Sequence, residues 1–167
     1  MKTIIYFKGV YDTLDLFTDH LIEAFESMGY GTFVYHTANE EVSKKMLLRL
    51  LGERKAEQYA VVTFNNLGYN LSFFTQDGQT EVTDHEEGKI EEHNIWDYFQ
   101  IPYIDILMDH PFHYEKPLHN MPQTAVILCT DRNHVKYVRR FFKNIRQTNF
   151  LPHAGVELGH KHKPLQE

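Results

Sequence analysis

The pattern of apolar and polar positions divides the chain into short apolar runs and longer stretches with helical periodicity. The apolar runs, rich in β-branched and aromatic residues as buried strands are, cover residues 3–7, 32–35, 59–64, 103–108 and 124–129. Stretches with an apolar residue at every third or fourth position predict helices over residues 14–28, 39–52 and 134–146. Strands that alternate with helices form βαβ units, so we predict an α/β fold: Rossmann-like, with three α/β/α layers and a mostly parallel sheet.

The helical periodicity also predicts which helix faces are buried. In the second helix the buried positions are Val42, Met46 and Leu50. In the third helix they are Val135, Val138, Phe142 and Ile145. The other positions of the third helix carry five basic residues: Lys136, Arg139, Arg140, Lys143 and Arg146. This basic face is either solvated or borders an anionic ligand or a second, acidic domain.

Residues 65–93 lack a regular apolar pattern and end in an acidic run. The pair Asp77-Gly78 between residues 71–75 and 80–82 indicates a hairpin turn. A short helix is expected around Trp96, followed by a loop over residues 111–123 and a last short strand and turn over residues 150–155. We expect residues 1–156 to form one domain and residues 157–167 to be a tail or a truncated interdomain linker.

Charge is distributed unevenly along the 167 residues. Residues 1–114 hold 8 Lys and Arg against 19 Asp and Glu, whereas residues 115–167 hold 9 against 4, for a net charge of −6. A nucleic-acid-binding domain usually carries a domain-wide basic footprint, so the acidic first part argues against that class. The apolar segment at the N-terminus is too short for a signal peptide or a membrane span, so we expect a cytoplasmic protein without a transmembrane segment.

Several kinds of site lack their sequence motifs. The loop after the first strand holds a single glycine, Gly9, and neither the dinucleotide motif GxGxxG nor the phosphate-loop motif GxxxxGK[ST] occurs. The motif HExxH is also absent, and the tail histidines lack metal-ligand spacing, so we expect no metal. Without GxSxG, and with the single cysteine Cys129 inside an apolar run, covalent acyl chemistry is disfavoured.

Polar residues follow almost every strand of the predicted sheet. Because ligands of open α/β sheets bind beyond the carboxyl ends of the strands, these residues are candidates for one ligand cleft. The candidate cleft residues are Gly9, Asn65, Asn66, Asp109, His110, Asp131, Arg132 and His153. Among them, Arg132 is best placed to meet a phosphate.

The run Asp109-His110-Pro111 is the most informative of these strand ends, because His and Pro are unusual choices for a simple cap. His110 could act as a general base towards a hydroxyl, since its ordinary pKa lies near neutral pH. Asp109 could orient a donor or bind ligand hydroxyls. Alternatively, Asp109 satisfies backbone N–H groups of the next loop while Pro111 fixes the turn.

An ordered series of motifs resembles the N-terminal region of a bacterial glycosyltransferase group, related to glycosyltransferase families 1 and 4 and including spore-maturation-protein-like enzymes. The series spans about residues 59–156. Its pieces are Thr63-Phe64-Asn65-Asn66, Ile101-Pro102-Tyr103, Met108-Asp109-His110-Pro111, Thr130-Asp131-Arg132-Asn133-His134-Val135 and Phe150-Leu151-Pro152-His153-Ala154-Gly155.

The resemblance implies that the chain is one half of a GT-B architecture, in which two Rossmann-like domains face each other across a cleft. The N-terminal domain would receive the glycosyl acceptor, and a C-terminal domain, in the same or a separate chain, would bind the sugar nucleotide. No cofactor is then expected in this chain. The glycine-rich loop common in such enzymes is reduced here to Gly9, and no Glu-containing donor motif is visible, so no catalytic base is assigned.

Three functions therefore stay open at this point. The first is the acceptor-side domain of a sugar-nucleotide-dependent glycosyltransferase, inactive alone. The second is a non-enzymatic α/β ligand-binding or interaction module. The third is a small hydrolase that uses Asp109 and His110 in one pocket.

Overall fold

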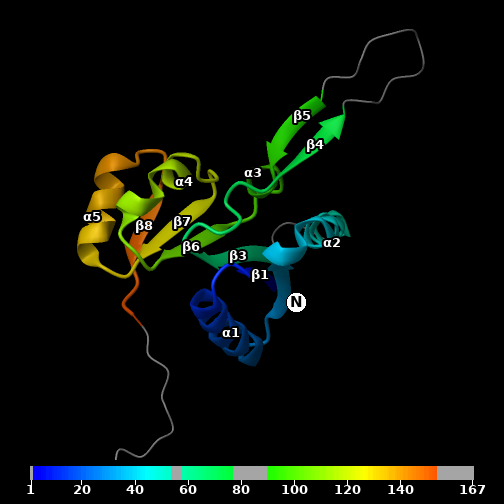
Figure 1. The fold of residues 1–167 in the computed structure, drawn as a ribbon. Helices are drawn as coiled ribbons and strands as arrows, with labels where there is room; N and C mark the ends of the chain where they lie inside the picture. Colours follow the sequence, from blue (N-terminus) through cyan, green and yellow to red (C-terminus); the bar gives the residue numbers. More distant parts are fainter. Residues whose placement is uncertain (1, 54–57, 77–89, 154–167) are drawn as a thin grey trace, which may run out of the picture.

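A computed structural model describes residues 2–53, 58–76 and 90–153, and it confirms the predicted three-layer α/β architecture for them (Figure 1). In this described part, six parallel strands form the central sheet. Helix α1 (Asp12–Ser27) packs on one face of the sheet, whereas α2 (Glu40–Glu53) and α5 (Arg132–Phe141) pack on the other. Each face therefore has its own apolar core.

The elements follow the predicted order along the chain. The sheet strands are β1 (Thr3–Lys8), β2 (Gly31–His36), β3 (Tyr59–Phe64), β6 (Tyr103–Leu107), β7 (Ala125–Cys129) and β8 (Gln147–Phe150). The antiparallel strands β4 (Ser72–Gln76) and β5 (Ile90–Asn94) form an arm that projects from the body in Figure 1. The short helical elements are η1 (Thr37–Asn39), α3 (Ile95–Tyr98), η3 (Pro111–Tyr114) and α4 (Glu115–His119).

The strand order identifies where a ligand crevice should lie. The strands are arranged β2-β1-β3-β6-β7-β8, so the chain leaves β1 in one direction and returns to pair β3 on its other side. This is the doubly wound arrangement with the flavodoxin-type order, and its winding reverses between β1 and β3. At such a switch point the loops after the two strands diverge to opposite faces of the sheet and leave space at the carboxyl edge.

The predicted buried face of α2 is wrong by one residue. Val42 and Met46 are 60% and 58% exposed, and Leu50 is only partly buried against the core. Leu47 and Leu51 are buried instead, in line with Ser43. Ser43 also lies on this buried face, and its hydroxyl both accepts from the backbone N–H of His36 and donates to the His36 carbonyl (3.1 Å each). The edge strand β2 thus obtains partners for backbone groups that would otherwise lack them. Apolar periodicity alone does not reveal a serine used in this way.

Other predicted boundaries also change. Helix α5 ends at Phe141 rather than at residue 146, and the last strand occupies residues 147–150 rather than beginning at 150. The segment 111–123, expected as a loop, contains η3 and α4. Strand β4 pairs with β5, while the expected turn at Asp77-Gly78 and the strand over residues 80–82 lie outside the described residues. The predicted domain boundary at residue 156 lies outside them as well.

Candidate functional site

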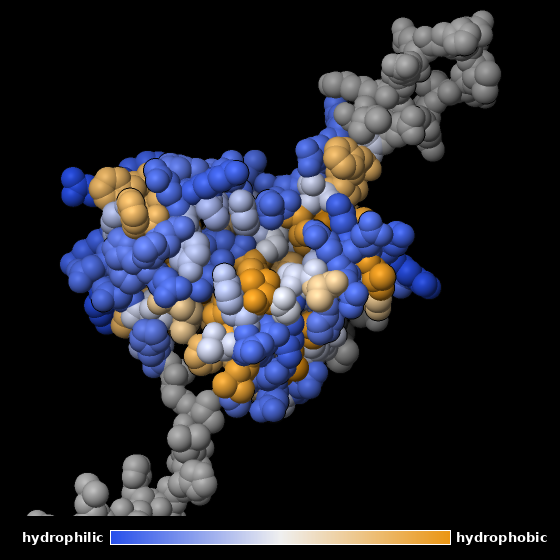
Figure 2. Space-filling view, viewed as in Figure 1, coloured by the Kyte–Doolittle hydropathy of each residue, from blue (hydrophilic) through white to orange (hydrophobic). Residues whose placement is uncertain are grey.

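A cleft of about 540 Å³ lies at the switch point of the sheet. It is bounded by the loop after β1 with the start of α1, by the turn after β3, and by the segment that follows β6. The residues that give it its character are Tyr11, Phe17, Asn65, Met108, Asp109 and Tyr114. Figure 2 shows apolar residues gathered over α1 and the adjoining centre of this face, whereas the surface over α5 is mostly hydrophilic.

The carboxylate of Asp109 is held at the cleft by two donors. Asn65 Nδ2 donates to Asp109 Oδ2 over 3.1 Å, and the hydroxyl of Tyr114 donates to the same oxygen over 2.9 Å. No hydrogen bond from a described residue reaches the other oxygen, Oδ1. Because each carboxylate oxygen can accept two hydrogen bonds, Asp109 keeps acceptor capacity for a ligand in the cleft.

Tyr114 is a reliable donor in this arrangement. Burial raises the pKa of its hydroxyl well above the ordinary value, and the hydrogen bond to Asp109 and the charge of that carboxylate raise it further. The phenol therefore stays protonated throughout the physiological range. Tyr114 fixes the orientation of Asp109 and does not act as a base.

The turn that carries Asn65 has an uncommon backbone. Asn65 and Asn66 both adopt positive φ, 48° and 66°, a region that asparagine tolerates better than most side chains do. Asn65 Oδ1 accepts the backbone N–H of Met108 over 2.9 Å, so this side chain joins the ends of β3 and β6. Asn66 points inward instead: it is 4% exposed, and its backbone N–H donates to Asp105 over 2.9 Å.

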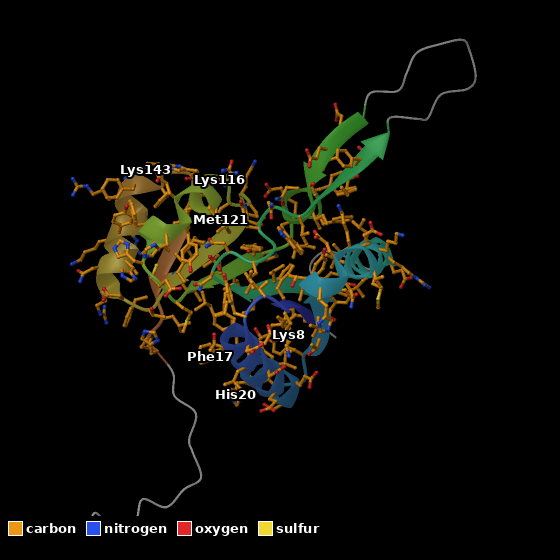
Figure 3. The ribbon with its side chains drawn as sticks, in the orientation of Figure 1. Lys8, Phe17, His20, Lys116, Met121 and Lys143 are labelled. Atoms are coloured by element: carbon orange, nitrogen blue, oxygen red, sulfur yellow. The ribbon has the colours of Figure 1, made fainter. Side chains whose placement is uncertain are left out.

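Gly9 forms a turn beside the cleft and offers no site for phosphate. Its φ of 95° favours glycine, and a Cβ there would come within 3.0 Å of the Thr37 hydroxyl. Its backbone N–H donates to both oxygens of Asp15, at 3.0 and 3.1 Å. The neighbouring Lys8, at the end of β1 in Figure 3, is paired with Asp19 over 2.6 Å. An anion approaching this loop would meet carboxylates.

His110 does not share the cleft with Asp109. Its Nδ1 accepts the backbone N–H of Phe112 over 3.1 Å and so caps η3, in which Pro111 occupies the first turn. The ring contacts His134 and Tyr137, with centroids 4.6 and 5.0 Å away. The backbone group of the next loop that Asp109 was considered to satisfy is thus satisfied by His110. Asp109 and His110 form no joint acid–base pair.

The remaining candidates lie at the β7–β8 side of the sheet edge. Asp131 caps α5 by accepting the backbone N–H of Asn133. The guanidinium of Arg132 lies 4.3 Å from the ring centroid of Phe150, a cation–π contact. His153 is exposed beyond β8. None of these three lines the cleft, so of the eight candidates the structure brings together Asn65 and Asp109, with Gly9 adjacent through Val10.

The aromatic walls of the cleft were not predicted from the sequence. Tyr11 is 64% exposed and Phe17 is 38% exposed, although Phe17 lies in an apolar helical pattern. Figure 3 shows Phe17 projecting from α1. An aromatic residue directly before a helix that follows β1, together with Tyr114 five residues after Asp109, is the sequence signal that could have identified them.

The described residues hold neither a metal-ligand cluster nor a membrane-spanning helix. In the described ranges, no group of three or more His, Cys, Asp or Glu side chains is arranged to hold a metal ion. None of the described helices has the length and apolar character needed to cross a membrane. No family model, curated protein or solved structure is significantly similar to this chain.

Proposed function

We propose that the cleft binds a hydroxylated ligand, a glycosyl acceptor, and that the chain is the acceptor-side domain of a sugar-nucleotide-dependent glycosyltransferase of the GT-B type. The observation that carries the proposal is the carboxylate of Asp109, held through one oxygen and open through the other, between the aromatic walls of the cleft. The sugar nucleotide would bind a C-terminal domain, in the same or a separate chain.

The chemistry of the walls suits a sugar. A sugar presents hydroxyl donors around its rim and C–H groups on its faces, so it needs fixed acceptors beside flat apolar surface. Asp109 supplies a charged acceptor, and a hydrogen bond to a charged group is stronger than one between neutral groups. Tyr11 and Phe17 supply aromatic surface within the same cleft.

The same geometry disfavours the hydrolase hypothesis. That hypothesis needs Asp109 and His110 in one pocket, whereas the His110 ring packs against His134 and Tyr137. Burial and the neighbouring His110 both lower the pKa of His134, which favours the neutral form of the His134 imidazole. The pair is thus part of the packing between η3 and α5.

On the α1 side of the sheet, several apolar residues are only half-buried, and a second domain could pack on them. Ile104 on β6 and Val126 and Leu128 on β7 are only half-buried, although they point to the α1 side of the sheet. Alternation along β7 places Ala125, Ile127 and Cys129 in the opposite core, so the difference is specific to one face. Packing of the nucleotide-sugar-binding domain here would complete the burial of these strands.

The proposal is tested by titrating the ¹⁵N-labelled chain with N-acetylglucosamine and methyl glucoside as acceptor-like probes. We expect amide shifts confined to the loop after β1, the turn after β3 and the segment after β6. Sugar nucleotides such as UDP-glucose should shift none of these amides, because Asp15 already accepts the backbone N–H of Gly9 and Asp19 pairs with Lys8. Shifts confined to the β7–β8 side, or strong UDP-glucose binding at Gly9, would contradict the proposal.

A non-enzymatic ligand-binding or interaction module is the alternative, and the flavodoxin-type strand order is compatible with it. It predicts that probes bind the same cleft but that no sugar is transferred when the chain is combined with a nucleotide-sugar-binding domain and supplied with UDP-glucose. Transfer in the combined protein that is lost in Asp109→Ala would favour the glycosyltransferase.

A further inference from the structure

Asp105, in the middle of β6, is a fully buried carboxyl group that the cleft does not touch directly. It is 0% exposed and pairs in register with Thr63 on β3 and Ile127 on β7. Its Oδ1 accepts the backbone N–H of Asn66 over 2.9 Å, and no described residue bonds to its Oδ2. A buried acid without a cationic partner is costly, so its presence at the centre of the sheet calls for a structural reason.

The hydrogen bond of Asp105 is to the turn after β3, in which Asn65 and Asn66 have positive φ. Two consecutive residues with positive φ persist only where the surroundings fix them. Asn66 is buried at 4% exposure, and its side-chain amide has no hydrogen-bond partner among the described residues, so its side chain does not anchor the turn by a hydrogen bond. The backbone bond to Asp105 does.

The turn continues directly into the cleft. Asn65, the other strained residue, accepts the backbone N–H of Met108 and donates to Asp109. The order of contacts is therefore Asp105 to the Asn66 backbone, then the Asn65 side chain, then the Asp109 carboxylate. A shift of the Asn66 backbone would move the amide that orients Asp109.

We propose that Asp105 is a positioning residue for the cleft: through the Asn65–Asn66 turn it sets the orientation of Asp109, and its protonation state alters that orientation. The part that concerns ligand affinity rests on the proposed function. The part that concerns the turn does not, since it can be observed without any ligand.

The protonation state of Asp105 changes near neutral pH. Burial raises the pKa of its carboxyl to about 7, although the hydrogen bond from Asn66 opposes this. The titratable groups that face it are Tyr103 on its own strand, Tyr114 on η3 and Cys129 on β7, and burial raises the pKa of each. Of these groups, Asp105 is thus the one that gains charge as pH rises through neutrality. The ionised form accepts the stronger hydrogen bond from Asn66.

The test compares the wild-type chain with Asp105→Asn, Asp105→Leu and a matched control, Asp97→Asn. Asp97 also accepts a backbone N–H, from Gln123 over 2.7 Å, but it lies on α3, away from the cleft. The first readout is the chemical shift of the Asn66 amide and of the Asn65 side-chain amide between about pH 5 and 9 without ligand. The second is the affinity for N-acetylglucosamine.

We expect both amides to titrate together near pH 7 in the wild type and in Asp97→Asn, and to be independent of pH in Asp105→Asn. Asp105→Leu, which removes the acceptor, should weaken probe binding at least about tenfold, whereas Asp105→Asn at pH 6 stays close to the wild type. An Asn66 amide that does not titrate, or one that titrates without the Asn65 side chain, would overturn the inference. If no variant binds the probe but both amides titrate, the proposed function fails and the positioning role stands.

Discussion

On the β1–β3–β6 side of the sheet edge, the polar residues that follow the strands face a cleft. On the β7–β8 side, equally polar residues make contacts within the fold and do not line the cleft. Asp109 keeps an oxygen open to the cleft, whereas Asp131 caps α5 and Arg132 lies over Phe150. Lys116 on α4 and Lys143, which follows α5, lie on the same side of the molecule, away from Phe17 on α1 (Figure 3).

The difference follows from the direction of winding. After β1 and β3 the chain departs to opposite faces, which separates the two loops. After β6 and β7 the chain continues on the same face, and η3 and α5 pack together through His110 and Tyr137. Residue type alone therefore does not make a site. The same acids and amides become a site only where the topology leaves a space beside them.

The largest expected effect is on the segment that follows β3, on the cleft side of the sheet edge. Gly68 has a φ of 77°, and a Cβ there would overlap the ring of Phe7. Gly68→Ala should therefore lower the free energy of unfolding by about 3 kcal/mol or more. Gly29, with a φ of 84° and nothing within 4 Å, is the matched control, and Gly29→Ala should cost about 1 kcal/mol. Equal losses in urea unfolding would show that Phe7 does not fix the turn.

The next effect concerns the pH dependence of stability. The pKa of Asp105 is about 7 in the folded chain and near 3.8 when exposed. Between these values the unfolded chain releases a proton that the folded chain keeps, so the contribution of Asp105 to stability falls as pH rises from about 4 to 7 and then levels. Asp105→Asn removes this loss, so relative to the wild type it should gain about 2–4 kcal/mol between about pH 4 and 8. A difference that is flat with pH would contradict burial as the cause.

A smaller effect is expected for the loss of a single tyrosine hydroxyl, and it should differ between a tyrosine in the cleft and one outside it. Tyr114→Phe removes the hydroxyl that donates to Asp109 and should lower stability by about 1 kcal/mol while weakening probe binding about threefold to tenfold. Tyr98, 53% exposed on α3, provides the control, and Tyr98→Phe should change neither quantity. Equal effects of the two substitutions on probe binding would show that the hydroxyl of Tyr114 has no specific role in ligand binding.

The smallest effect tests the β7–β8 side. Asp131→Ala removes the cap of α5 and should cost about 0.5–1 kcal/mol in stability. Probe binding should be unchanged, because Asp131 does not line the cleft. If Asp131→Ala weakened probe binding as much as Tyr114→Phe, the two sides of the edge would have to be joined in one site.

These contrasts also explain what could be predicted from the sequence. Strands and helices were predictable because their apolar patterns are long and regular, and Asn65 and Asp109 were predictable because they directly follow strands. The contribution of Tyr114 and Phe17 depends on strand order, which no local pattern specifies. The buried face of α2 includes the hydrogen bonds of Ser43 to β2, and His110 turns away from Asp109 to cap η3. Both features depend on hydrogen bonds of a single side chain, which an apolar pattern does not predict.

The central claim is that Asp109 presents an acceptor oxygen to a hydroxylated ligand in the switch-point cleft. The most direct measurement is the affinity of the wild type, Asp109→Ala and Asp131→Ala for N-acetylglucosamine, followed by amide shifts at constant pH. We expect Asp109→Ala to bind the probe at least about tenfold more weakly than the wild type, and Asp131→Ala to bind it with wild-type affinity. Unchanged binding in Asp109→Ala, with shifts that map elsewhere, would contradict it.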